Sequence, residues 1–212
     1  GLGHKALTTN TTASNNTAVG ACSLYANTTG YDNTAIGFAA LVTNTTGIRN
    51  TASGKYALFC NTSGCNNVAM GGSSLCKNTS GCHNTAVGHY SLAANTTSLR
   101  NVAVGMVAMR HNTTGACNTA SGYGALYCQT TAVRNTAFGG NALYCTTAGF
   151  NTAVGAFSNI DGSNISLSAE LFSVDGKHRY FIKETKDINL AKELGREVGE
   201  ALKSQSKGSY KR

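Results

Sequence analysis

The residues with the clearest chemical potential are eight cysteines spread through a chain of 212 residues. Thiols in this number suit either a metal site or a set of disulfides. A structural zinc site is disfavoured because no Cys-x-x-Cys pair occurs in the sequence. Two pairs are separated by 17 residues, Cys65 with Cys82 and Cys128 with Cys145. We predict that the members of each pair lie close enough to bridge, with reduced surface thiols as the alternative, and we predict no metal site.

Three arginines form a second candidate set because their separations are multiples of the same interval: Arg49, Arg100 and Arg134. They would either attract acidic glycans and lipopolysaccharide phosphates or serve as solvated turn residues. Nucleic-acid binding requires aromatic residues interleaved with basic ones, and this pattern is not visible along the sequence. We therefore predict no nucleic-acid partner. No combination of residues within residues 1–155 predicts a catalytic or cofactor-binding site.

The shared interval reflects a repeated unit of 17 residues. A fixed short period is typical of repeat architectures. Counted from its first asparagine, each unit has alanine at position 3, glycine at position 5 and, in the full-length units, leucine or methionine at position 9. Most units then continue with Asn-Thr-Thr-Gly or a close variant from position 12. Units begin at Asn16, Asn33, Asn50, Asn67, Asn84, Asn101, Asn118 and Asn135, each 17 residues after the last, and a shortened one begins at Asn151.

The unit favours short strands over helix, because glycine and turn-favouring residues recur too often for a helix. Strands stacked as rungs about 4.8 Å apart would let asparagine side chains hydrogen-bond along the stack. Asn-Thr-Thr-Gly would form the turn, with its glycine supplying a positive φ. We thus predict a mainly β fold, with a β-solenoid or β-roll over residues 1–155. Positions 4 and 9 offer each rung few sizeable apolar side chains, so self-association is expected to supply the missing burial.

Charge composition divides the chain into two parts. Asp32 is the sole acidic residue before residue 156, and the other eight of the nine acidic residues follow it. The repeats are basic, with seven of the 17 lysines and arginines, whereas the tail is nearly balanced. No apolar run is long enough to span a bilayer, and no charged-then-apolar leader opens the chain. Because Gly1 falls inside a repeat, we expect the chain to be a fragment without its natural N-terminus.

The unit Asn-Thr-Ala-Val-Gly-x-x-Ala-Leu-x-x-Asn-Thr-Thr-Gly resembles repeats in phage tail-fibre and other fibrous surface proteins. It is similar, more loosely, to the β-roll heads of trimeric autotransporter adhesins. The resemblance covers residues 1–155. It implies a homotrimeric fibre, extracellular or on a virion surface, that binds a cell-surface glycan or a protein receptor.

The tail, residues 156–205, predicts a small α+β module made of a β-hairpin and one helix. Ile165, Leu167, Ala169 and Leu171 alternate with polar residues, as in a half-buried strand. Asp175-Gly176 is a hairpin turn signal, and the returning strand is expected over residues 179–184. A helix begun by Asp187 or Asn189 then follows. Its apolar stripe is Leu190, Leu194, Val198, Ala201 and Leu202. Residues 206–212 are expected to form a disordered basic end.

Residues 154–205 also resemble the C-terminal domain of hydroxymethylbilane synthase (porphobilinogen deaminase). The matching motifs are Val154-Gly155-Ala156-Phe157, Ile160-Asp161-Gly162, Leu167-x-Ala169, Val174-Asp175-Gly176, Ala191-x-x-Leu194-Gly195 and Glu200-x-Leu202. In that family a loop cysteine holds the dipyrromethane cofactor through a thioether. The resemblance places Phe150 at this position, which implies that the cofactor cannot attach.

Two functions follow from these two resemblances. The first is a structural and binding fibre segment without catalysis. The alternative is a fragment or chimera of hydroxymethylbilane synthase, a cytoplasmic transferase of tetrapyrrole biosynthesis. It would carry only the C-terminal domain and be inactive as it stands. The repeat and the synthase-like tail share a short sequence close to Thr-Ala-Val-Gly-Ala-Phe. Recombination within this shared sequence would join them.

Overall fold

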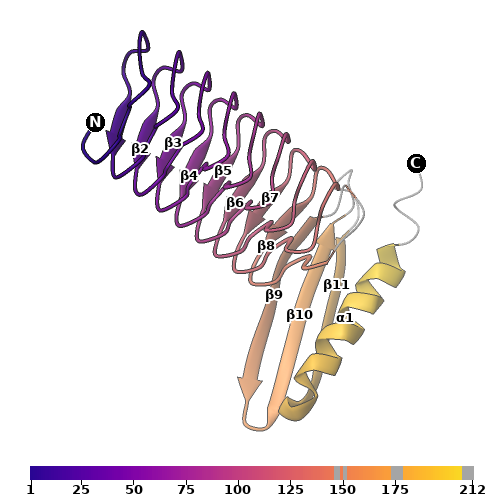
Figure 1. Ribbon diagram of the computed structural model, residues 1–212. Helices are drawn as coiled ribbons and strands as arrows, with labels where there is room; N and C mark the ends of the chain where they lie inside the picture. The colour runs from indigo at the N-terminus through magenta and orange to yellow at the C-terminus, as the bar shows by residue number, and fades with distance from the viewer. Residues whose placement is uncertain (146–148, 150–151, 173–178, 207–212) are drawn as a thin grey trace.

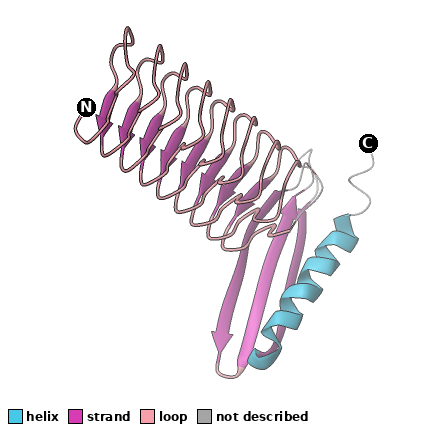
Figure 2. Cartoon of the chain, in the orientation of Figure 1, coloured by secondary structure: helices cyan, strands magenta, loops and turns pink. Residues whose placement is uncertain are grey.

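The computed structural model describes residues 1–145, 149, 152–172 and 179–206. Short strands stack along one axis like the rungs of a ladder, and a longer antiparallel sheet with one helix follows (Figures 1 and 2). Within the described residues, all strands belong to one eleven-stranded sheet whose spatial order is the order of the sequence. The fold is therefore mainly β, a parallel β-solenoid followed by a small α+β part, as the repeat and the tail pattern predict.

Eight three-residue strands form the parallel part of the sheet. Equivalent positions pair in register, so that Thr17 lies beside Thr34 and Ala18 beside Ala35. The spacing between paired residues equals the sequence period, which means that each unit is one rung. The strands are β1 (Thr17–Val19), β2 (Thr34–Ile36), β3 (Thr51–Ser53), β4 (Val68–Met70), β5 (Thr85–Val87), β6 (Val102–Val104), β7 (Thr119–Ser121) and β8 (Thr136–Phe138).

The core of the solenoid is a narrow column of small and medium side chains. Position 3 contributes an alanine, position 8 an alanine or serine, and position 9 the single large residue of each rung. The fully buried residues at position 9 are Leu24, Leu41, Leu58, Leu75, Leu92, Met109 and Leu126. Position 4 lies outside this core, although the sequence pattern identifies positions 4 and 9 as the two sizeable apolar positions of each rung. In a strand successive side chains point to opposite faces, so the buried alanine at position 3 forces position 4 outward.

Two ladders of buried amides replace much of the missing apolar core. At position 12, Asn44 Nδ2 donates to Asn27 Oδ1 over 2.8 Å, and the same contact recurs up the stack. At position 1, the backbone N–H of Asn50 and its Nδ2 both donate to Asn33 Oδ1. From Asn16 to Asn118, each position-1 Nδ2 also donates to the position-15 carbonyl of its own unit, as Asn50 does to Gly64. Buried amides satisfied in this way fix the register of one rung on the next.

The backbone has positive φ at several positions where the sequence has no glycine. Residues at positions 7, 9 and 17 have positive φ although most of them are not glycine; Leu75, for example, has φ 49°. A left-handed residue with a side chain costs about 1–2 kcal/mol. Neighbouring rungs compensate, because the N–H of Leu75 donates to the carbonyl of Ser91 over 3.0 Å.

The glycines have other roles than the one predicted for the Asn-Thr-Thr-Gly turn. Positive φ belongs to the glycine at position 5, such as Gly88 with φ 128°, and not to the glycine at position 15. The position-15 glycine is needed for space instead. A Cβ on Gly64 would lie 2.5 Å from the carbonyl oxygen of Gly81 in the next rung. The expectation of a positive φ at this turn glycine is therefore wrong, because close stacking of rungs excludes a side chain there.

The tail continues the sheet without a break. Strand β9 (Thr152–Asp161) pairs in parallel with β8 at its start and antiparallel with β10 (Asn164–Phe172) along most of its length. Strand β11 (Arg179–Asp187) completes the antiparallel part. The sequence predicts β10 and β11 as a hairpin but not the length of β9, which crosses the expected boundary at residue 155. The expected turn at Asp175-Gly176 lies outside the described residues.

The helix of the tail covers strands β10 and β11 (Figure 1). A 3-10 turn (Ile188–Leu190) leads into α1 (Ala191–Ser206), and Asp187 Oδ1 accepts from the N–H of Asn189 at its start. Leu194 and Val198 are buried with Ala169 and Ile182 as the sequence stripe predicts. Leu190 is exposed instead, because it belongs to the 3-10 turn and not to the helix. The predicted disordered end, residues 207–212 of it, lies outside the described residues.

Candidate functional site

The outer face of the parallel sheet, defined by positions 2 and 4 of β1–β8, is the first candidate binding surface. Position 2 carries threonine or valine, and position 4 carries mostly large apolar residues. Met70 and Phe138 keep 47% and 44% of their surface exposed. Eight rungs at about 4.8 Å make this face ~40 Å long, and two side-chain rows make it ~10 Å wide. These apolar and threonine side chains form a patch of ~400 Å², an area in the size range of exposed patches that often mark an interaction site.

The three predicted arginines occupy the turn at position 17, where each has a positive φ. All three are exposed. Arg49 Nε lies 3.8 Å from Asp32 Oδ2, and its guanidinium lies 5.7 Å from the Tyr31 ring centroid. The set does not form a continuous row, because uncharged or histidine residues fill the same position in the rungs between them. The turn role is therefore the better description of these arginines.

A second surface forms where positions 6, 7, 10 and 11 meet at one corner of the rungs, which we name the aromatic–basic corner. Lys55 Nζ lies 5.0 Å from the Tyr56 ring centroid and 6.0 Å from that of Phe38. The Arg110 guanidinium carbon lies 4.9 Å from the Tyr90 centroid. The expectation that basic and aromatic residues are not interleaved is wrong for the folded chain. Stacking brings together residues that the sequence keeps about one repeat apart.

Both predicted cysteine pairs lie on adjacent rungs. Cys128 and Cys145 are joined by a disulfide, with their Cα atoms 4.7 Å apart. Cys65 and Cys82 are free thiols whose Sγ atoms are 2.7 Å apart. Burial raises the pKa of the Cys82 thiol, and its hydrogen bond with Cys65 raises that pKa further. Because the thiolate is the reactive form, this raised pKa slows attack by the Cys82 sulfur at neutral pH.

We expect oxidised glutathione at pH 8.5 to convert Cys65 and Cys82 into a disulfide, because their sulfur atoms already touch. The two thiols lose two protons and two electrons, and one glutathione disulfide becomes two glutathione thiols. Under non-reducing conditions, mass spectrometry of a tryptic digest should then find peptide 56–77 linked to peptide 78–100. Cys65→Ser is the control that separates this pair from Cys60 and Cys76 on the same peptide. A linked peptide in that variant, or none in the wild type, would contradict the prediction.

The described residues offer little that suits a metal or an enclosed substrate. Among them no group of three or more His, Cys, Asp or Glu side chains could hold a metal ion. Within the same residues no helix has the length and apolar character required to cross a membrane. Phe150, the position that the synthase resemblance assigns to cofactor attachment, lies outside the described residues.

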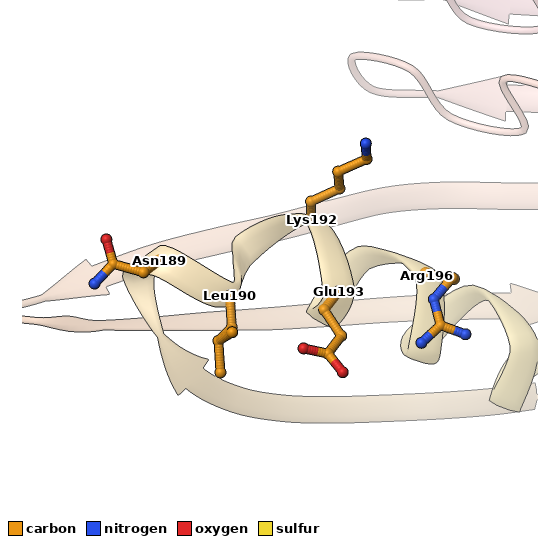
Figure 3. Close-up of a pocket in the computed structure, with 5 residues that line it drawn as sticks. All are labelled: Asn189, Leu190, Lys192, Glu193 and Arg196. Carbon is orange, nitrogen blue, oxygen red and sulfur yellow. The ribbon is translucent and has the colours of Figure 1, made fainter.

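One open depression lies beside the start of α1, lined by Asn189, Leu190, Lys192, Glu193 and Arg196 (Figure 3). All five residues come from the 3-10 turn and the first turns of α1, and all five are exposed. Nearby, Lys186 Nζ lies 2.7 Å from Glu197 Oε1, and this hydrogen bond raises the pKa of Lys186. Of the charged residues that line the depression, Glu193 Oε1 lies 3.9 Å from Lys186 Nζ and Arg196 Nη1 lies 3.3 Å from Glu200 Oε1, so both are engaged in ion pairs along the helix surface.

The fold and these surfaces define the chain as a parallel β-solenoid repeat protein with an antiparallel β-sheet and one helix at its end. No protein-family profile matches the chain, and no solved structure matches it. The chain is similar to a probable porphobilinogen deaminase of Nitrosopumilus maritimus (strain SCM1), with 38% identity over 58 residues. The match covers 27% of this chain and 19% of that protein. The chain thus spans about a fifth of the length of this relative.

Proposed function

We propose that this chain is a structural and binding protein. It forms a β-solenoid segment of a homotrimeric fibre that presents a repetitive surface to a cell-surface glycan or a protein receptor, without catalysis. Its place is extracellular or on a virion surface. The observation that carries the proposal is the outer face of β1–β8, where most rungs expose an apolar side chain at position 4 and together form an apolar patch.

The arrangement of the outer face suits further copies of the same chain. Its strands are in register, so equivalent rungs of parallel copies would meet at equal heights around a shared axis. Val19, Ile36, Met70, Val104 and Phe138 would be buried by this contact. Assembly would supply the burial that one narrow core lacks.

The ends of the solenoid also fit a structural role. An unpaired strand edge is a template for uncontrolled association. At the C-terminal end, β9 pairs with β8 and then turns into the antiparallel part, so the tail covers the edge of the last rung. In this proposal the tail is the cap or anchor of the fibre segment.

Two charge substitutions on the outer face should dissociate the assembly. Met70→Glu with Val104→Glu would place buried, unpaired carboxylates at the shared axis of the trimer, which is strongly unfavourable. We expect light scattering after size exclusion to report one chain of 21.8 kDa for this variant and about three times that mass for the wild type.

The matched control is Tyr31→Glu with Leu99→Glu, two exposed residues that share position 16 away from the outer face. This variant should keep the mass of the wild type, and both variants should keep its circular dichroism. Equal masses for the outer-face variant and the wild type would contradict an interface on this face.

The likeness to a probable porphobilinogen deaminase supports a second candidate, a fragment or chimera of hydroxymethylbilane synthase that is inactive as it stands. The matched length, 58 residues, is close to the length of the tail over which the sequence resembles that family. If Phe150 replaces the cysteine that holds dipyrromethane, the chain cannot acquire this cofactor. We expect no consumption of porphobilinogen and no gain in protein mass on incubation with it. Consumption above a protein-free control would instead favour an enzyme, in the cytoplasm.

A further inference from the structure

The aromatic–basic corner concentrates positive charge that nothing acidic on the solenoid offsets. From the third to the sixth full unit, every rung contributes a basic or histidine side chain to it. These residues are Lys55, Lys77, His89, Arg110 and His111. The acidic residue of the repeats, Asp32, lies at position 17 beside Arg49 and not in the corner. The formally charged members of this row are Lys55, Lys77 and Arg110, on the third, fourth and sixth rungs, and successive rungs are about 4.8 Å apart.

Aromatic rings fill the spaces between these cations. The rings of Phe38 and Tyr56 contact edge to face with their centroids 5.5 Å apart. The rings of Tyr56 and Phe59 contact in the same way, with centroids 5.3 Å apart. Further along, His111 contacts Tyr127 edge to face at 4.8 Å. Tyr123 keeps 55% of its surface exposed. Exposed rings provide flat apolar patches, and the lysine and arginine over them are held by cation–π contacts.

This combination matches a linear polymer with an anionic group about every 5 Å and apolar ring faces between these groups. Acidic polysaccharides have both features, since sulfate or carboxylate groups alternate with the C–H faces of sugar rings. A single-stranded nucleic acid fits less well. Tyr127 and Tyr144 on successive rungs already stack at 4.8 Å with an interplanar angle of 3°. A base inserted between two rings needs about 7 Å, twice the stacking distance of about 3.4 Å.

We propose that the aromatic–basic corner binds acidic polysaccharide lying along the stack of rungs. This inference rests on the proposed function, because it names the ligand class of the binding fibre and the surface that recognises it. The polymer runs parallel to the solenoid axis and places its anionic groups opposite Lys55, Lys77 and Arg110. The position-17 arginines are not part of this site.

The test compares two triple variants that each remove three positive charges. The corner variant is Lys55→Gln, Lys77→Gln and Arg110→Gln, and the control variant is Arg49→Gln, Arg100→Gln and Arg134→Gln. Calorimetry with heparin and with polygalacturonate should show at least a tenfold loss of affinity for the corner variant and less than a threefold loss for the control. Binding by the wild type should weaken as salt is raised. Dextran, which is uncharged, should not bind.

Tyr123→Ala adds a test of the rings, because it leaves the charge unchanged and should reduce affinity for both polysaccharides several-fold. Equal losses for the two triple variants would overturn the proposal, since they would show attraction by net charge alone. Tighter binding of a twenty-base oligo(dT) than of either polysaccharide would overturn it as well. Light scattering on the same samples separates this inference from the fibre. A trimer that binds neither acidic polymer refutes the inference alone, whereas a monomer that binds both refutes the trimer alone.

Discussion

Replacing Gly88 with alanine is expected to destroy the cooperative stacking of the central rungs. Gly88 has φ 128°, and a Cβ there would lie 2.5 Å from the carbonyl oxygen of Gly105 in the next rung. Both the positive φ and the clash oppose the substitution, and neither can relax without separating the rungs. We expect a loss of at least about 4 kcal/mol in the free energy of unfolding, among the largest single-residue effects. Urea unfolding followed by circular dichroism measures it.

The chain provides a matched control in its own helix. Gly199 lies within α1, and a Cβ added to it would meet no heavy atom within 4 Å. Gly199→Ala should therefore stabilise the helix by up to about 1 kcal/mol, because alanine favours a helix interior more than glycine does. If Gly88→Ala unfolded at the same urea concentration as the wild type, successive rungs could not be in the close contact that the structure shows.

The second large effect is expected from Asn84→Asp, in the middle of the position-1 ladder. Asn84 is fully buried, and its Nδ2 donates to Asn67 Oδ1 over 3.2 Å and to the carbonyl of Ser98 over 2.9 Å. An ionised aspartate cannot donate, so two buried acceptors would lose a partner and face a negative charge. Each unsatisfied buried group costs about 1–3 kcal/mol. We expect a loss of at least about 3 kcal/mol at pH 7, read from urea unfolding.

The pH dependence of this loss identifies its cause. Burial raises the pKa of the introduced carboxyl above its unfolded value of about 3.9. The penalty should thus be smaller below about pH 4, where the carboxyl is protonated in both states and donates one hydrogen bond. It should grow as the pH rises through the folded pKa. Asn141→Asp is the control, because Asn141 is exposed at a turn of the same solenoid and should tolerate the change. A pH-independent loss in Asn84→Asp would argue against a buried amide ladder.

Much of the solenoid can be predicted from the sequence because its period and its contacts coincide. A 17-residue repeat places Asn44 beside Asn27, and identical amides one rung apart can hydrogen-bond to each other along the stack. The same register predicts that Cys65 and Cys82 are neighbours, as are Cys128 and Cys145. The apolar alternation of β10 and the stripe of α1 likewise follow from the periods of strand and helix.

Other features depend on contacts between rungs that no local pattern records. Leucine at position 9 rarely adopts a positive φ, and it does so here because its N–H reaches the carbonyl of the next rung, as in Leu75. The outward direction of Met70 becomes evident only once its neighbour Ala69 is known to face the core. The aromatic–basic corner could not be predicted from the sequence for the same reason. Tyr90 and Arg110 are 20 residues apart in the chain but adjacent in the stack.

We propose that the solenoid is a structural element that associates through its outer face. Sedimentation equilibrium of the wild-type chain over a wide range of concentrations tests this claim most directly. We expect a species of about three times 21.8 kDa that persists on dilution to micromolar concentrations. A single species of 21.8 kDa at all concentrations would contradict it, because the outer face would then remain uncovered in solution.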